Sequence, residues 1–130
     1  MDLKKYFEST EGTGILATAD DHGRVDVAIY SKPHIMEEGA CAFIMADRLT
    51  HQNLQVNDHA AFLFIEKGPG YNGKRLLLTK IREEQDSERL YSIRSRKRPA
   101  QKEEGKIRFL VFFKIDNVLP LVGAVKLSDL

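Results

Sequence analysis

The sequence predicts a mainly β protein in which about six antiparallel strands form a closed or partly closed barrel, with two or three short helices. Two observations support this class. Short apolar or alternating segments recur along the 130 residues, and turn signals rich in Gly and Asp separate them. A sheet of βαβ units needs a helix between successive strands, whereas most connections here are short, as in an antiparallel barrel.

The first half of the chain contains a short helix and three strands. Residues 2–8 form the helix, since Asp2 is a suitable cap and Leu3, Tyr6 and Phe7 share one face. Turn signals at 20–23 and 36–39 separate the strands. We expect those strands over residues 14–20, 25–30 and 40–45.

The second predicted strand has the alternation of a half-buried strand. Val25, Val27 and Ile29 alternate with polar or small residues. Pro33 then ends regular pairing or places it at an edge.

The second half continues with a short helix at about 50–57 and strands over 60–66, 74–82 and 108–116. Residues 85–96 are the best candidate for a longer helix, because Asp86 or Ser87 can cap it and Leu90 and Ile93 form a narrow apolar stripe. Apolar residues in the tail, 118–130, suggest docking against the body or a second subunit.

Composition limits the function classes. Twenty basic and nineteen acidic residues give a net charge of +1, which argues against a dedicated nucleic-acid binder. The single cysteine forms no intramolecular disulfide, the N-terminus does not have the pattern of a signal peptide, and the apolar runs are too short for a membrane span. We therefore expect one cytoplasmic domain over residues 1–130, with no nucleic-acid or membrane partner.

The segment 40–54, ACAFIMADRLTHQNL, is the strongest candidate for a binding site. An apolar strand ends near Arg48, and a helix is expected to begin at Thr50. Unpaired N–H groups, the helix dipole, a hydroxyl group and a guanidinium group then favour an anion such as phosphate. The alternative is an ordinary Thr cap beside a surface Arg, and the spacing alone does not decide between them.

Other motifs have simpler interpretations. The loop GPGYNG at 68–73 is followed by a strand, so a hairpin loop is favoured over a dinucleotide site. The cations of 94–98 are interpreted as a solvated helix end. No zinc spacing or nucleophile elbow occurs, so we predict no metal site and assign no catalytic residue. Cys41 is interpreted as an inert buried thiol, and His51 more readily as a surface residue than as a ligand contact.

The order of these segments resembles the pyridoxamine 5'-phosphate oxidase-like family of split-barrel flavoproteins, especially its small members of the FMN-binding-protein type. The likeness covers roughly residues 3–122. The Thr-x-x-Asn-Leu element, Thr50 to Leu54, is its most specific part. The likeness is carried, in order, by GILATAD, VDVAIYSKP, DRLTHQNL, AAFLFIE, GPGYNGKRLLLTKI and FLVFFKID.

The resemblance implies a six-stranded split barrel that forms a homodimer, with FMN at the subunit interface. By position, Arg48 and Thr50 bind the FMN phosphate together with the start of the short helix. Leu49 stands where relatives often have a basic phosphate ligand, so this chain departs from the family there. Lys74 and Arg75 are further candidate cations for the phosphate.

The isoalloxazine ring is expected along the second predicted strand. In the family, backbone groups of this strand read the polar edge of the flavin, and an apolar slot suits the ring. One Arg, one Thr and backbone amides are enough for micromolar binding, at roughly 1.5–3 kcal/mol for each charge-assisted hydrogen bond. The matching residues are Ala28, Ile29, Tyr30 and Ser31.

The resemblance favours an FMN-dependent oxidoreductase or electron carrier of unknown substrate. Pyridoxamine 5'-phosphate oxidases carry a C-terminal segment with Arg and His that holds the substrate phosphate, and LVGAVKLSDL has no counterpart to it. We therefore do not expect vitamin B6 oxidation. Two alternatives remain open: a non-catalytic flavin- or haem-binding protein, and a split barrel that has lost its cofactor.

Overall fold

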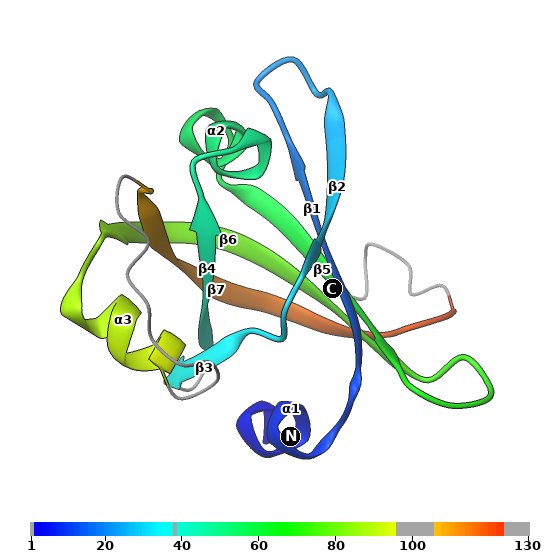
Figure 1. The fold of residues 1–130 in the computed structure, drawn as a ribbon. Coiled ribbons are helices and arrows are strands. Elements are labelled where there is room, and N and C mark those ends of the chain that lie inside the picture. The colour runs from blue at the N-terminus through cyan, green and yellow to red at the C-terminus, as the bar shows by residue number, and fades with distance from the viewer. Residues whose placement is uncertain (1, 38, 96–105, 124–130) are drawn as a thin grey trace.

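Seven antiparallel strands form one strongly curved sheet in the described part of the chain (Figure 1). The computed structural model describes residues 2–37, 39–95 and 106–123. The strand order is β2-β1-β5-β6-β7-β4-β3. The strands are β1 (Gly12–Ala19), β2 (Val25–Tyr30), β3 (His34–Glu37), β4 (Ala40–Ala46), β5 (His59–Glu66), β6 (Gly73–Gln85) and β7 (Arg108–Pro120).

The prediction of a mainly β chain is confirmed. The predicted number of six strands is wrong, because the described residues form seven strands, and the sheet is not closed into a barrel. The sheet stays open, with β2 and β3 as its edges. The missed strand is β3, whose end we had predicted as part of the turn 36–39. It has only four residues and a bulge between Ile35 and Glu37, so it lacks a clear alternation.

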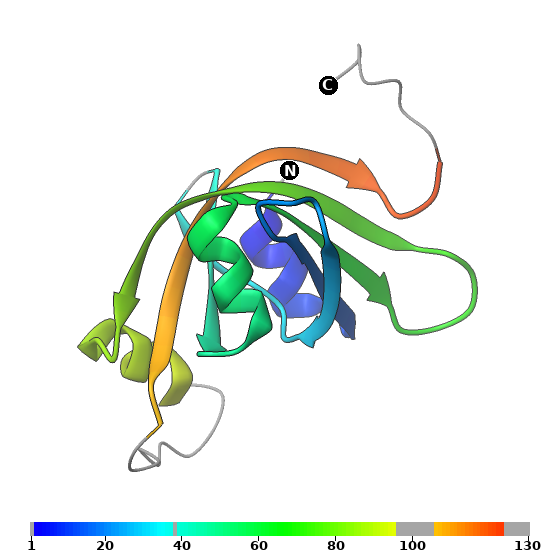
Figure 2. The same cartoon turned by 90° about the horizontal axis from the view of Figure 1, so that it is seen from above.

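The long strands β6 and β7 produce the curvature. Each has 13 residues, and they arch over the two helices α1 and α2 when seen from above (Figure 2). Their register shifts between Leu77 and Leu78 and again between Lys80 and Arg82. Such bulges bend a strand and increase its twist, which curls a sheet without closing it.

Three helices complete the described fold: α1 (Leu3–Ser9), α2 (Leu49–Val56) and α3 (Glu88–Ser95). The predicted caps are confirmed for two of them. Asp2 accepts a hydrogen bond from the Lys5 amide at 3.1 Å, and Ser87 accepts one from the Leu90 amide at 3.1 Å. Among the described residues, none of the helices has the length and apolar character needed to cross a lipid bilayer.

The first half of strand β7, residues 109–113, is buried on both faces, because the sheet is covered on both sides there. Its residues Phe109, Val111 and Phe113 enter the main core, which lies inside the curved sheet. Leu110 and Phe112 point the other way and pack with Leu90 of α3. The continuous apolar run FLVFF is therefore typical of a strand covered on both faces rather than of an alternating surface strand.

Strand β2 alternates as predicted, but its apolar side faces outward. Val25, Val27 and Ile29 are 81%, 67% and 74% exposed, while Asp26, Ala28 and Tyr30 are partly buried. The predicted alternation of β2 is thus confirmed. Its three apolar side chains, however, lie next to one another on the surface. A row of this kind is typical of a surface that another molecule covers.

We predict that Phe62→Ala lowers the free energy of unfolding by about 3–5 kcal/mol. Phe62 is fully buried and contacts the rings of Phe7, Phe43 and Phe64, so its removal leaves a cavity. Ile65→Ala on the same strand, where the side chain is 37% exposed, serves as a control that loses about 1 kcal/mol or less. Urea unfolding measures both, and equal losses would contradict this description of the core.

Candidate functional site

A cavity of about 520 Å³ lies between β2, the end of β4 and the start of α2. A volume of this size suits a small organic ligand or cofactor. Side chains of α3 and β7 reach the same space. The lining residues are 26–32, His34, 43–46, 48–50, Arg94 and Arg108.

Seven of the nine residues predicted for the site line this one cavity. They come from two segments that are distant in sequence, and the fold brings both segments to the same space. They are Ala28, Ile29, Tyr30, Ser31, Arg48, Leu49 and Thr50.

The structure does not bring Lys74 and Arg75 to this cavity. The Lys74 ammonium lies 4.7 Å from the centre of the Tyr6 ring. The Arg75 guanidinium donates hydrogen bonds to the carbonyl oxygens of Pro120 at 2.9 Å and Gly123 at 2.8 Å. Contacts within this chain therefore explain the positions of both side chains without a ligand.

The start of α2 differs from the prediction by one residue. The helix begins at Leu49, and Arg48 is its N-cap, with an extended backbone and no side-chain capping bond. Thr50 lies inside the first turn and is only 4% exposed. Thr50 is therefore not the cap, but its hydroxyl group still lies among the first amides of the helix, beside the cavity.

Tyr30 joins Arg48 and Thr50 at this end of the cavity. Its ring meets Phe43 edge to face at 6.0 Å. Burial raises the pKa of the Tyr30 hydroxyl, while a hydrogen bond with Thr50 and the nearby Arg48 guanidinium act in the opposite direction. Two hydroxyl groups and one permanent cation thus converge there, and such a set of groups suits an anion with several oxygen atoms.

Sequence analysis missed two further cations of the cavity. Arg94 was interpreted as part of a solvated helix end, and the other cations of that run, 96–98, lie outside the described residues. Arg108 was interpreted only as the first residue of a core strand. It pairs with Ala46 across β4 and β7, and no local pattern reveals that pairing. Leu49, the predicted departure from the family, is 53% exposed and lines the same cavity.

His51 is neither a surface residue nor a cavity residue. It is 5% exposed and stacks on Phe109, with 3.7 Å between ring centres. Its Nδ1 lies 3.0 Å from Asp47 and its Nε2 lies 2.9 Å from Glu83. The interpretation of His51 as a surface residue is therefore wrong, since the side chain ties the start of α2 to β6.

The Thr-x-x-Asn-Leu element is partly structural. Asn53 is buried, and its amide donates a hydrogen bond to the Thr18 hydroxyl at 3.1 Å. Leu54 is fully buried in the main core. Within this element Thr50 lines the cavity, while Asn53 and Leu54 fasten α2 to the sheet.

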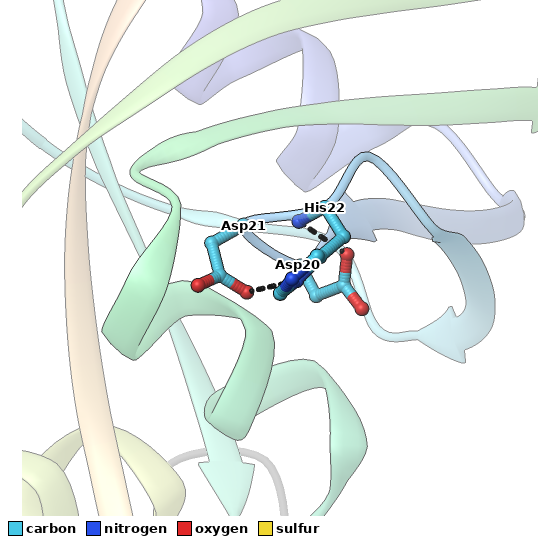
Figure 3. Close-up of side chains that lie close together, drawn as sticks. All are labelled: Asp20, Asp21 and His22. Atoms are coloured by element: carbon cyan, nitrogen blue, oxygen red, sulfur yellow. Dashed lines mark hydrogen bonds and ion pairs between the residues drawn. The ribbon is translucent and has the colours of Figure 1, made fainter.

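Asp20, Asp21 and His22 form a cluster at the β1–β2 turn, in which Asp20 is partly buried and the other two are exposed (Figure 3). The Asp20 carboxylate accepts hydrogen bonds from the amides of His22 and Arg24, both at 2.9 Å. These hydrogen bonds stabilise the turn, and this role explains why the three residues lie together. Cys41 is fully buried, as predicted, and burial raises the pKa of its thiol to about 12.

Comparison with solved structures identifies the fold. An FMN-binding protein from Syntrophomonas wolfei superposes with a TM-score of 0.72 at 19% identity, covering 95% of this chain and 85% of the other. A proposed pyridoxamine 5'-phosphate oxidase from Lactobacillus delbrueckii gives 0.67 at 16% identity, covering 92% of each. HutZ, a haem storage protein from Vibrio cholerae, gives 0.58 at 18% identity, covering 94% and 89%.

No family model matches the sequence, and no curated protein matches it significantly. The structural likeness is extensive, however, and it covers nearly the whole of each chain. The chain therefore has the pyridoxamine 5'-phosphate oxidase-like split-barrel fold, and the resemblance seen in the sequence is confirmed at the level of the fold.

We predict that Glu83→Gln reduces the loss of stability in acid. Burial raises the pKa of Glu83, but hydrogen bonds from Gln55, His51 and Lys80 outweigh it and hold the pKa at about 2. A depressed pKa stabilises the fold above about pH 5, and this stabilisation is lost as the pH falls toward 2. Urea unfolding between these limits measures the difference.

Glu11→Gln is the control, because the Glu11 side chain is 80% exposed. It should keep the pH dependence of the parent protein. The stabilising role assigned to ionised Glu83 is wrong if Glu83→Gln and the parent lose equal stability between pH 5 and 2.

Proposed function

We propose that this chain is an FMN-binding flavoprotein that acts as an oxidoreductase or electron carrier. One observation carries the proposal: residues 28–31 and 48–50, selected for an FMN site from the sequence, line a single cavity. The solved structures with this fold include a protein described as FMN-binding. A cytoplasmic location belongs to the same proposal, and the single buried cysteine is compatible with it.

The described residues fit a phosphate monoester. Arg48 supplies a permanent positive charge, Thr50 and Tyr30 supply hydroxyl groups, and the first turn of α2 supplies backbone amides. The isoalloxazine ring would lie along β2, where Val27, Ile29 and Tyr30 line the cavity. When bound, the flavin supplies the redox chemistry, and the protein holds and orients it.

A homodimer is part of this proposal. Val27 and Ile29 line the cavity and are also among the most exposed apolar residues of the chain. A second copy that covers the outer side of β2 would bury them and close the open side of the cavity. Leu49 and Val56 of α2, 53% and 54% exposed, extend the apolar surface available to it.

Haem binding is a second candidate. His34 lines the cavity and offers an imidazole, and one solved structure with this fold is described as a haem storage protein. Loss of the cofactor is the third candidate, and Leu49 is the reason to consider it. The visible spectrum of the purified protein separates the three: flavin bands support the proposal, haem bands support the second, and a colourless protein that ignores added FMN supports the third.

We predict that Arg48→Ala combined with Thr50→Ala weakens FMN binding at least tenfold, since both phosphate contacts are lost. Quenching of flavin fluorescence on titration gives the dissociation constant. Lys114→Ala is the matched control, because its side chain is 70% exposed and lies outside the described lining of the cavity. An unchanged constant for the double variant would place the phosphate elsewhere. Lys74→Ala and Arg75→Ala, measured in the same way, test the two remaining predicted residues.

We predict that Ile29→Lys makes the protein monomeric, because it places a charge in the proposed apolar interface. Light scattering measures the mass in solution. Ile81→Lys is the control: Ile81 is 59% exposed on β6, away from β2. A parent protein that is monomeric, or an Ile29→Lys variant that stays dimeric, would refute this interface.

A further inference from the structure

Three parts of the chain enclose the ring of His51, which lies in the first turn of α2 directly after Thr50. The ring is buried and stacks on Phe109 of β7, with 3.7 Å between ring centres and 12° between ring planes. Asp47 contacts it from the connection before α2, and Glu83 contacts it from β6. The stacking fixes the plane of the ring, and the two carboxylates fix its rotation within that plane.

Both ring nitrogens of His51 face an oxygen atom that only accepts hydrogen bonds. Nδ1 lies 3.0 Å from Asp47 Oδ1, and Nε2 lies 2.9 Å from Glu83 Oε2. Burial raises the pKa of Glu83, but its hydrogen bonds hold that pKa at about 2, so this carboxylate has no proton to donate near neutral pH. Both contacts are therefore hydrogen bonds only when both ring nitrogens carry protons.

The other polar groups beside the ring agree with this arrangement. The Gln55 amide nitrogen lies 3.0 Å from Nε2 of His51, but its two protons have other acceptors: Glu83 Oε1 at 2.9 Å and the His51 carbonyl oxygen at 3.2 Å. The Lys80 ammonium lies 2.9 Å from Glu83 Oε1. Two carboxylates, this ammonium and a doubly protonated ring have no net charge together, so loss of one ring proton leaves a charge of −1.

The ring of His51 is connected to the anion site through the backbone of α2. Arg48 is the N-cap, Thr50 lies in the first turn, and both line the cavity. Arg108, which precedes Phe109 on β7, lines the cavity as well. The first amides of the helix belong to the same turn as His51, so the hydrogen bonds of its ring hold these donors in place. A charge of −1 beside this turn would also oppose an anion bound there.

We propose that His51, with both ring nitrogens protonated, is a positioning residue that holds the first turn of α2 in the orientation that binds the phosphate of FMN. His51 is not among the lining residues of the cavity, so it acts through Arg48, Thr50 and the first amides. The proposal rests on the proposed function and adds a dependence on pH: the affinity for an anion falls when the ring loses a proton. A ring that only supported the fold would not cause a loss specific to anions.

Two probe ligands separate positioning of the anion site from support of the fold. Sulfate does not change its charge near neutral pH, so a change of its affinity with pH originates in the protein. Riboflavin lacks the phosphate of FMN, so it reports on binding of the ring system alone. Amide chemical shifts of the first turn of α2 follow sulfate binding, and NMR of the imidazole nitrogens shows at which pH the His51 ring loses its proton. Fluorescence titration gives the affinities for FMN and riboflavin.

The variants change the ring, one of its partners or an unrelated histidine. His51→Gln removes the imidazole, and Asp47→Asn removes one carboxylate whose side chain is 54% exposed. His59→Gln is the matched control, because His59 is exposed on β5 and lies outside the described lining of the cavity. Thermal unfolding shows whether each variant is folded, and the pH dependence of the parent protein needs no variant.

We expect the parent protein to bind sulfate about threefold or more weakly once the His51 ring has lost a proton. His51→Gln should show this weak binding at every pH, and it should weaken FMN but not riboflavin. Asp47→Asn should move the fall in sulfate affinity to lower pH, because one carboxylate fewer favours the protonated ring. His59→Gln should keep the pH dependence of the parent.

The proposal is overturned if the His51 ring carries a single proton where sulfate binds most tightly, or if sulfate affinity is unchanged when the ring loses a proton. It is also overturned if His51→Gln weakens FMN and riboflavin by the same factor, because the residue then supports only the fold. If sulfate binds and FMN does not, the proposed function fails, and the sulfate titration still decides the role of His51. If neither binds, no anion site exists and both proposals fail.

Discussion

The pairing of β4 with β7 is the constraint on which the cavity depends. Seven consecutive pairs join the strands, from Ala40 opposite Lys114 to Ala46 opposite Arg108. Over most of this pairing both strands are buried on both faces, so a slip of one residue would exchange the side chains of the main core with those under α3. Burial therefore fixes where β4 ends and which residue of β7 stands beside that end.

Buried polar contacts also fix the position of the start of α2. His51 lies between Asp47 and Glu83, and Asn53 bonds to Thr18. Buried polar groups are costly unless they are paired, and no buried side-chain polar atom without a partner is found among the described residues. These pairs allow only one placement of the helix, so the amides and the Thr50 hydroxyl at its first turn are presented to the cavity in a fixed orientation. Such preorganisation reduces the cost of binding.

The difference between what was predicted and what was missed follows from distance along the chain. Residues 48–50 were found because strand end, cation and helix start are neighbours in sequence, and residues 28–31 because the family likeness covers them. Arg94 and Arg108 were missed because their place depends on the packing of α3 and on the register of β7. The strand β3 was missed for a different reason, because it has only four residues and a bulge and therefore shows no clear alternation.

The outward face of β2 connects cofactor binding with subunit association. Val27 and Ile29 belong both to the lining of the cavity and to the exposed apolar face, so the proposed ligand and the proposed partner would share one strand. A ring bound along β2 would add apolar area to the interface, and a second subunit would remove water from the ring and from the cations. Lower solvation strengthens each charge-assisted contact at the cavity. By thermodynamic linkage, flavin binding strengthens dimerisation by the same free energy by which dimerisation strengthens flavin binding. The apolar face of β2 and the cavity beside it are then parts of one arrangement, because occupation of either one stabilises the occupied state of the other.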